Sequence, residues 1–359
     1  MVEPDLTAAW RLDTHGLLGG GPGLVAGLAR GGELMSTITI GRETADPASP
    51  RLDAKTKFYV ASVAKQFTAA CLAVLEAAGT LCLTDSIRRH VRGLPSIFEP
   101  VTLNHLLHHT SGVLAARGLG PAEPGAWWLG VGLGDVVAEL ARTGTIVSQP
   151  GDVFRYANEG YWLLAAAIET ASTQPLSQVA QWRLFEPLGM AATRFRDRPE
   201  PPAIGTALGH TMREGVLRGI GTDFHVVGDG GLMSSLEDLA RWDQFWSGRS
   251  ALGPDLPLRM SRPGTLNDGA PMQYAWGVSS RTHRHQPILS HGGSFLGYLA
   301  KFTRFTELDF SVIVLANSDQ IDVDAFALRL ADLALEGMID LQSPSWADTY
   351  SIDGRARVL

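Results

Sequence analysis

Cysteine is scarce in this chain, with two residues, Cys71 and Cys82, among 359. Cys71 falls inside an apolar segment, where a thiol packs as a small hydrophobic side chain, so a disulfide framework is not expected. No apolar run is long enough to span a bilayer. The first residues, Met1-Val2-Glu3-Pro4-Asp5, lack the positive n-region and apolar core of a signal peptide. We therefore expect a cytoplasmic protein with no membrane partner.

A strong excess of one charge is also missing. The chain has 30 Lys and Arg against 37 Asp and Glu, a net charge of −7, and no basic cluster. This balance argues against nucleic acid as a partner. With 45% hydrophobic and 19% charged residues, the composition is that of a globular protein with a large core. Composition gives no indication of the oligomeric state.

Motifs of several other enzyme classes are absent. No G-x-S-x-G string occurs, which argues against the α/β-hydrolase fold. Gly19-Gly20-Gly21-Pro22-Gly23 has no strand before it, so a nucleotide-binding loop is not expected. His105, His108 and His109 have helical spacing, but no Glu follows the first histidine, so the zinc-protease pattern is missing. We expect no metal ion and no cofactor.

What the chain does contain is Ser62-Val63-Ala64-Lys65 at the start of a long Ala-rich segment. On a helix, positions i and i+3 share a face, so the Ser62 hydroxyl and the Lys65 amine can touch. A neighbouring amine can take the proton of a serine hydroxyl and make it a nucleophile. This S-x-x-K spacing is typical of serine acyl enzymes, although alone it is better explained by a helix-capping serine and a solvated lysine.

Two further short motifs follow in order. Tyr156-Ala157-Asn158 lies in a polar turn before an apolar helix, and His291-Gly292-Gly293-Ser294 precedes a strand-like stretch. Considered alone, Tyr156 is better explained as a core tyrosine and Asn158 as a helix cap. His291 could likewise be an ordinary strand histidine and the two glycines a bulge or turn. The joint order of the motifs and their flanking residues favours a functional interpretation.

The three motifs together resemble those of the serine β-lactamase and D,D-peptidase superfamily. The resemblance is greatest to its class C branch, which includes D-aminopeptidases and family VIII carboxylesterases. It extends through the segments Phe58 to Thr68, Leu106 to Gly112, Pro187 to Met190 and Gly230 to Ser235, in the family's order. Together these segments span roughly residues 20 to 335.

The expected fold is α+β (mixed α/β). Patterning predicts strands over 24–29, 34–40, 298–305 and 310–316, and helices over 62–78, 102–109, 133–142, 161–173, 176–185, 234–247 and 323–335. The resemblance implies one antiparallel sheet flanked by helices, with an inserted helical subdomain. We expect a single catalytic domain over 1–340, with an α/β lobe from about 15–60 plus 260–340, a helical lobe over about 61–259, and a polar tail over 341–359.

The resemblance also implies roles for the site residues. Ser62 would attack a carbonyl and become acylated, and Lys65 with Tyr156 would act as the general base pair. Asn158 would bind Lys65 and a substrate oxygen. The backbone N–H groups of Ser62 and Ser294 would form the oxyanion hole. Gly292 and Gly293 would let the substrate backbone lie close to the strand edge.

His291 departs from the motif, because β-lactamases and penicillin-binding proteins carry lysine there. A histidine near its ordinary pKa is mostly neutral at pH 7 and supplies no fixed charge for a substrate carboxylate. The change resembles esterase and D-aminopeptidase relatives, so efficient β-lactam hydrolysis is not expected.

Three functions remain open at this stage. The first is a serine acyl hydrolase acting on a small-molecule ester or amide, with D-amino-acid derivatives among the candidates. The second is an acyltransferase of small-molecule biosynthesis on the same scaffold, and the third is a non-catalytic binding or sensing module. For the substrate, the stretch 113–134 with Trp127-Trp128 predicts a long loop at the cleft, and Trp276 and Phe224 are candidate walls of an apolar pocket.

Overall fold

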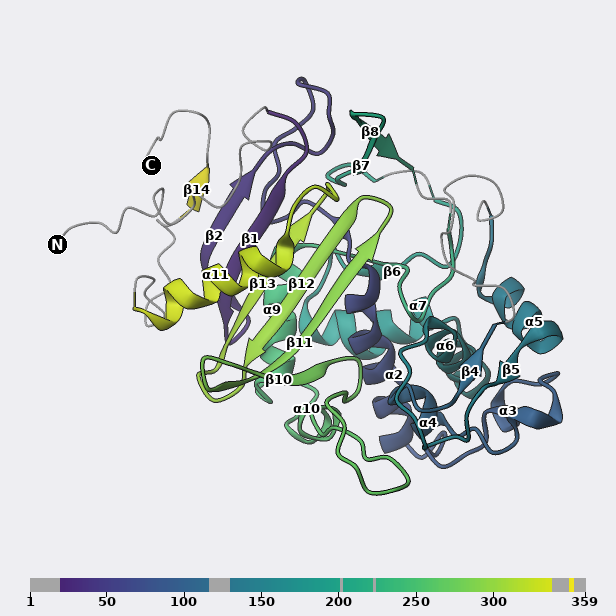
Figure 1. The fold of residues 1–359 in the computed structure, drawn as a ribbon. Helices are drawn as coiled ribbons and strands as arrows, with labels where there is room; N and C mark the ends of the chain where they lie inside the picture. Colours follow the sequence, from purple (N-terminus) through teal and green to yellow (C-terminus); the bar gives the residue numbers. More distant parts are fainter. Residues whose placement is uncertain (1–19, 116–129, 201–202, 222–223, 338–348, 352–359) are drawn as a thin grey trace.

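A seven-stranded sheet organises one half of the molecule in the computed structural model, which describes residues 20–115, 130–200, 203–221, 224–337 and 349–351. The strand order is β10-β11-β12-β13-β1-β2-β14 (Figure 1). The strands are β1 (Leu24–Arg30), β2 (Glu33–Ile40), β10 (Ser279–His283), β11 (Gln286–Phe295), β12 (Tyr298–Phe305), β13 (Phe310–Ala316) and β14 (Thr349–Ser351). Neighbours pair antiparallel except β14, which runs parallel to β2.

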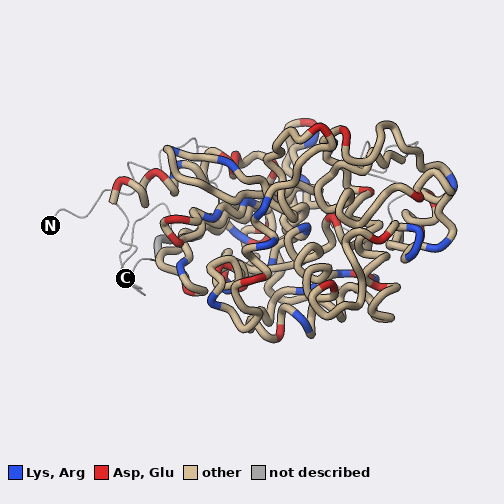
Figure 2. The backbone as a smooth tube through the Cα atoms, turned by 90° about the horizontal axis from the view of Figure 1, so that it is seen from below, with Lys and Arg blue, Asp and Glu red and all other residues tan. Residues whose placement is uncertain are grey.

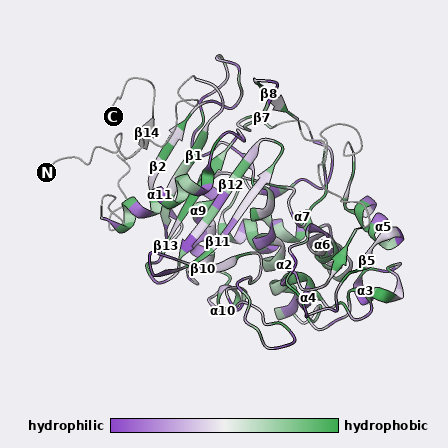
Figure 3. Cartoon of the chain, viewed as in Figure 1, coloured by the Kyte–Doolittle hydropathy of each residue, from purple (hydrophilic) through white to green (hydrophobic). Residues whose placement is uncertain are grey.

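The centre of this sheet joins the two ends of the chain. β1 pairs with β13, from Leu24 opposite Ala316 to Ala29 opposite Ser311. Both strands are buried on both faces, which explains their nearly continuous apolar sequences and their hydrophobic colouring in Figure 3. Pairing of N-terminal and C-terminal strands therefore fixes one core that neither end could form alone.

One helix covers each face of the sheet. α11 (Val323–Leu335) packs on β12 and β13 over a core that includes Leu28, Val314 and Phe326. α9 (Leu236–Trp246) lies on the other face against β1 and β13, and the Ser235 hydroxyl caps it by accepting from Asp238 N–H. Although α9 falls in the range expected for the helical lobe, it packs on the sheet.

The other half is mainly helical and is centred on α6 (Asn158–Ser172), which contacts α2, α3, α4, α5 and α7. The remaining helices are α2 (Lys65–Ala77), α3 (Ile87–His90), α4 (Leu103–Leu107), α5 (Leu133–Thr143), α7 (Leu176–Ala180), α8 (Glu186–Leu188) and α10 (Asp255–Met260). Short strands form three small sheets. The first contains β3 (Phe58–Tyr59), β9 (Leu232–Ser234) and β6 (Arg194–Phe195). The second contains β4 (Val113–Leu114) and β5 (Thr145–Ile146), and the third contains β7 (Gly209–Arg213) and β8 (Val216–Ile220). Within the described ranges, no helix is both long and apolar enough to cross a membrane.

The mixed α/β fold with an antiparallel sheet is confirmed, and the predicted bounds of β12, β13 and α11 match the structure. The predicted helix over 62–78 needs correction, because a 3₁₀ helix (Ala61–Ala64) precedes α2. The helix predicted over 176–185 continues from α7 as a π-helical stretch (Gln181–Phe185). The tail over 341–359 contains β14, and its other residues lie outside the described ranges. Most of the predicted loop over 113–134, including Trp127-Trp128, also falls outside them.

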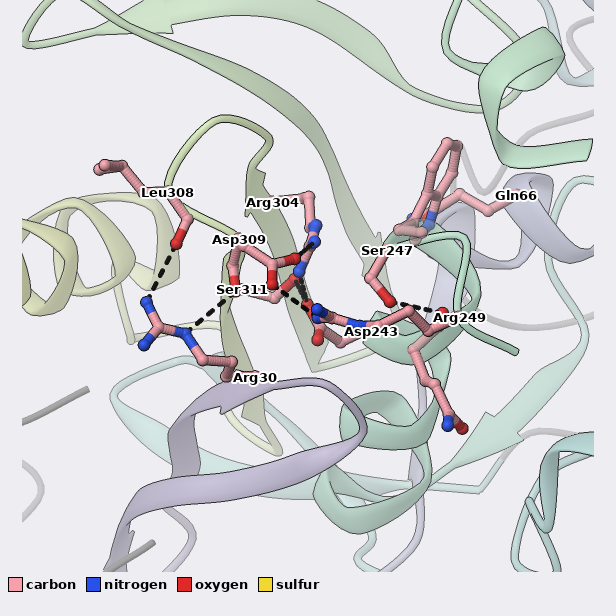
Figure 4. A network of polar contacts seen from close by, with 11 residues as sticks. Arg30, Gln66, Asp243, Ser247, Arg249, Arg304, Leu308, Asp309 and Ser311 are labelled. Atoms are coloured by element: carbon pink, nitrogen blue, oxygen red, sulfur yellow. Dashed lines mark hydrogen bonds and ion pairs between the residues drawn. The ribbon is translucent and has the colours of Figure 1, made fainter. Parts of the chain in front are cut away.

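A buried charge network joins α9 to the sheet (Figure 4). The Arg304 guanidinium on β12 pairs with Asp243 of α9 and with Asp309, and the Ser311 hydroxyl donates to Asp243 at 2.5 Å. The side chains of Arg304 and Asp243 are 3% and 0% exposed. Arg249 also pairs with Asp309, at 2.6 Å, but its side chain is 54% exposed. Elsewhere, acidic and basic residues are interspersed along the chain (Figure 2).

Arg304→Met should therefore lower the free energy of unfolding by about 3–5 kcal/mol, because it leaves Asp243 buried without its cation. Arg249→Met removes a solvent-exposed partner of the same network and should lower the free energy of unfolding by no more than about 1 kcal/mol. Chemical denaturation of both variants measures the difference. Equal losses of unfolding free energy in the two variants would show that burial of the Arg304–Asp243 pair does not determine how much the network stabilises the fold.

Candidate active site

Ser62 and Lys65 meet where the 3₁₀ helix passes into α2. Lys65 Nζ donates to Ser62 Oγ at 3.1 Å, to Asn158 Oδ1 at 2.9 Å and to the Asp229 carbonyl oxygen at 2.9 Å. Lys65 is fully buried, whereas Ser62 is half-buried and open to a substrate. An ammonium group has three N–H donors, so these three acceptors satisfy it completely. Ser62, Lys65 and Asn158 are thus brought into direct contact, as predicted.

The backbone before the nucleophile is strained. Ala61 has φ of +47°, a conformation that residues with a Cβ rarely adopt. The short 3₁₀ turn that follows places Ser62 and Lys65 on the same side, because its period is three residues. The i,i+3 contact that the sequence predicts is therefore formed by a 3₁₀ turn and not by an α-helix.

Tyr156 stands at the mouth of the site. Its side chain is 42% exposed, and Lys65 Nζ lies 5.0 Å from its ring centroid. The Tyr156 hydroxyl has no hydrogen-bond partner among the described residues. Its ring packs against the His109 ring, with centroids 4.3 Å apart. The structure therefore brings Tyr156 beside Lys65 through its ring, while its hydroxyl is left available to a substrate.

β11 presents the third motif beside Ser62. β10 pairs with β11 only up to Ser290, so from His291 onward one edge of β11 has no strand partner among the described residues. A Cβ on Gly293 would lie 2.2 Å from the Val60 carbonyl oxygen and 3.1 Å from Ser62 N, so only glycine fits there. Gly292 has space for a Cβ, with its nearest neighbour at 3.8 Å, and Ser294 is exposed. The close approach of this strand to Ser62 is consistent with the predicted pair of N–H donors.

His291 is held in its neutral form. Its Nδ1 lies 2.6 Å from the Gly292 carbonyl oxygen and must carry the proton, while Nε2 accepts from the Tyr274 hydroxyl at 3.1 Å. Burial lowers the pKa of His291 to about 3, and the charges of Lys65 and Lys301 act in the same direction. The expectation of an uncharged His291 at pH 7 therefore agrees with its surroundings.

Three further residues belong to the site but were not predicted. The Asp229 carboxylate accepts from Trp162 Nε1 at 2.6 Å, and burial raises its pKa although Lys65 opposes the shift. His109 is 2% exposed, and its Nδ1 accepts from Ala157 N–H at 3.2 Å, beside Tyr156. Tyr274 orients His291. For His109 the sequence did offer a signal, because it stands directly before Thr110-Ser111-Gly112 in a family segment.

The histidines considered as metal ligands have separate partners. His105 accepts from Thr102 N–H at 3.2 Å at the start of α4, and His108 Nδ1 lies 3.0 Å from the Asn104 carbonyl oxygen. Within the described ranges, no group of three or more His, Cys, Asp and Glu side chains is arranged to hold a metal ion.

A cavity of about 550 Å³ opens beside Tyr156 and His291. Phe154, Tyr274 and Met272 give it an apolar wall, and Arg281 and Lys301 line it as well. Trp276 and Phe224, the predicted pocket walls, do not line this cavity. Phe224 instead packs against Phe295, with ring centroids 5.3 Å apart.

Comparison with known proteins agrees with this geometry. Residues 14–336 match the family model described as Beta-lactamase. The chain belongs to the beta-lactamase family. This beta-lactamase-family chain is 29% identical over 325 residues to Penicillin-binding protein 4* of Bacillus subtilis, covering 86% of this chain and 71% of that protein. It is 27% identical over 325 residues to a D-aminopeptidase of Brucella canis, covering 88% of this chain and 60% of that protein.

Among solved structures, the octameric penicillin-binding protein homologue from Pyrococcus abyssi superposes with a TM-score of 0.79 at 24% identity, covering 93% of this chain and 78% of that one. This likeness shows the shared fold. The beta-lactamase family and the D-aminopeptidase relative support a serine hydrolase of the beta-lactamase-like superfamily.

Gly293→Ala should destabilise this beta-lactamase-family chain more than Gly292→Ala, because only the first places a Cβ against the backbone of Val60. We expect Gly293→Ala to lower the free energy of unfolding by about 1–3 kcal/mol, a typical cost of overpacking, and Gly292→Ala to cost less than half as much. Thermal and chemical unfolding of both variants measures this. A Gly293→Ala protein as stable as the wild type would contradict the close approach of β11 to Ser62.

Acidification should destabilise the fold through His291. Because its pKa is lowered in the folded protein, the unfolded chain binds more protons between about pH 3 and pH 6.5, so this stability is present at neutral pH and lost as the pH falls. The loss is at most about 1.4 kcal/mol per pH unit. His291→Gln should flatten the fall in stability between pH 6.5 and pH 4.5, measured by urea unfolding. Parallel curves for the two proteins would show that His291 is not the source.

Proposed function

We propose that this chain is a serine acyl hydrolase that acts on esters or small amides through an acyl-Ser62 intermediate, with D-amino-acid derivatives as a candidate substrate class. The contact of Ser62 with Lys65, which Asn158 and Asp229 hold in place, is the observation that carries the proposal. The name of the D-aminopeptidase relative supports the candidate substrates.

In the acylation step, Ser62 Oγ forms a bond to the substrate carbonyl carbon as the leaving group departs. The Oγ proton passes to the Lys65–Tyr156 pair and then to the leaving oxygen or nitrogen. An unprotonated Lys65 amine accepts the Oγ proton across the 3.1 Å contact, and the free Tyr156 hydroxyl at the open side of the site passes a proton on to the leaving group. Backbone N–H groups of Ser62 and Ser294 would stabilise the oxyanion.

Neutral His291 and the shape of the cavity bear on the substrate. An uncharged imidazole that is already hydrogen-bonded to Tyr274 offers no positive charge to a substrate carboxylate at that position. The apolar wall formed by Phe154, Met272 and Tyr274 suits an acyl or aromatic group. Both features support a neutral ester or amide over a β-lactam as the substrate.

Two alternatives are kept. In an acyltransferase, an amine or alcohol would replace water as the acceptor of the acyl group from Ser62. In a binding or sensing module, the cleft would hold a ligand without reaction. The intact Ser62–Lys65–Asn158 contact disfavours the binding module, and the identity of the acceptor is a matter for experiment.

Turnover of p-nitrophenyl butyrate is the test. Wild type should release p-nitrophenol and carry a butyryl mass adduct, and Ser62→Ala should show neither, with turnover reduced by about 10³-fold or more. Tyr156→Phe should reduce kcat by about 10²–10⁴-fold with the fold intact, because it removes the proton relay. Ser96→Ala changes an exposed serine in another part of the surface and is the matched control.

The outcomes separate the three functions. Rapid turnover with a transient adduct supports the hydrolase. A persistent adduct that amines or alcohols discharge, with formation of a new amide or ester, supports the acyltransferase. Absence of both turnover and adduct in the folded wild type, also with D-alanine p-nitroanilide, would reject acyl-Ser62 chemistry on these substrates and favour the binding module.

A further inference from the structure

A second cavity, of about 390 Å³, lies at the segment 263–276. The same segment lines both cavities: Gly264, Thr265 and Trp276 line the second, whereas Met272 and Tyr274 line the cavity beside Tyr156 and His291. Its turn is fixed by pairing of Thr265 with Pro271. Asn267 Nδ2 anchors it by donating to the Pro150 carbonyl oxygen at 2.9 Å and to Asp152 at 2.7 Å. The segment is thus a firmly held partition with one cavity at each side.

The second cavity is lined by cationic and hydrogen-bonding groups. Its polar side chains include those of Asn104, His105, Thr265, Arg259, Arg262 and Asn267. None of the described lining residues is Asp or Glu, although the chain carries a net charge of −7. A cavity whose described lining contains two arginines and no carboxylate favours a negatively charged ligand.

The two arginines differ in their engagement. Arg259 pairs with Glu76 and lies over the Trp276 ring, with its guanidinium carbon 5.6 Å from the ring centroid. The Arg262 side chain is exposed and has no ion-pair or hydrogen-bond partner among the described residues. The Arg259 guanidinium therefore forms part of the cavity wall, and the Arg262 guanidinium is free to bind an anion. A planar guanidinium binds carboxylate and phosphate through two parallel N–H donors.

We propose that this cavity, the Arg262 cavity, binds a small oxyanion, a phosphate or a carboxylate, and that its occupancy changes the affinity of the active site for substrate. Its volume lies within the range of small-molecule sites. The free Arg262 guanidinium supplies the charge, and Asn104 and Thr265 contribute neutral polar side chains to the lining.

Two short connections link the Arg262 cavity to the catalytic residues. Trp276 is followed by Gly277, and a Cβ on Gly277 would lie 2.6 Å from the Lys65 carbonyl carbon and from Gln66 N, so this backbone lies directly against the start of α2. His108 contacts Trp276 edge-to-face, at 6.5 Å between ring centroids, and is followed by His109, which packs on Tyr156. A ligand that shifts Trp276 or His108 thus acts one residue away from groups that touch Lys65 and Tyr156.

The test measures binding without reference to turnover. Thermal unfolding of the full chain is recorded against increasing inorganic phosphate, citrate or acetate, each compared with chloride at equal ionic strength. We expect a saturable rise in Tm with phosphate or with a carboxylate in the wild type. Arg262→Gln should weaken the apparent affinity at least tenfold. Arg92→Gln removes the same charge from an exposed site outside the cavity and should behave as the wild type.

The anion that gives a saturable rise in Tm shows whether the ligand group bound by the cavity is a phosphate or a carboxylate. No saturable effect from any of the three anions, or equal effects in wild type and Arg262→Gln, would overturn the Arg262 cavity as an anion site. Coupling between the Arg262 cavity and the active site is measured as the effect of bound anion on the KM for p-nitrophenyl butyrate. We expect a change of at least twofold in the wild type and in Arg92→Gln, and no change in Arg262→Gln. Saturable binding with an unchanged KM would overturn the coupling, and an inactive protein would reject the proposed esterase without affecting the Tm result.

Discussion

The buried ammonium of Lys65 is the interaction on which this site depends. A lysine at 0% exposure is tolerated only when every N–H has an acceptor, and here the acceptors come from three separate segments: Ser62, Asn158 and the Asp229 backbone. Satisfying the lysine therefore requires the start of α2, the start of α6 and the loop before β9 to assemble correctly. The same contacts place the nucleophile, so the hydrogen bonds that satisfy Lys65 also position Ser62.

The sheet contributes through a steric constraint. β11 can approach Ser62 only because position 293 has no side chain, and it is fixed there through β12 to β13 and β1 at the centre of the sheet. The Arg304–Asp243 pair joins that sheet to α9 (Figure 4). On α9, Trp242 and Trp246 donate to Gln66 Oε1, next to Lys65 in sequence. The two halves thus meet at the nucleophile through both strand and helix.

Local sequence patterns correctly predicted the helices and strands whose conformation depends mainly on residues that are close in sequence. Strands β12 and β13 and helix α11 have the predicted bounds, and Ser62, Lys65 and Asn158 meet as their spacing and the family resemblance indicated. Asp229 lies 164 positions from Lys65 and touches it through a backbone carbonyl, which no side-chain pattern encodes. The 3₁₀ turn at Ser62 begins at Ala61, which has a φ of +47°, and lies against Gly293, features that helical periodicity does not reveal.

The electrostatics of the third motif follow from the same packing. A lysine at position 291 would place a second cation beside buried Lys65, in a site where the nearby Asp229 carboxylate is already hydrogen-bonded to Trp162. Histidine avoids this repulsion, because burial and the Tyr274 hydrogen bond keep it neutral. Positive charge in the lining of the cavity beside Tyr156 and His291 comes from Arg281 and Lys301, and Lys301 pairs with Asp324 at 2.5 Å. The site therefore keeps a single buried cation, Lys65, in contact with Ser62, and a neutral imidazole occupies position 291 beside it.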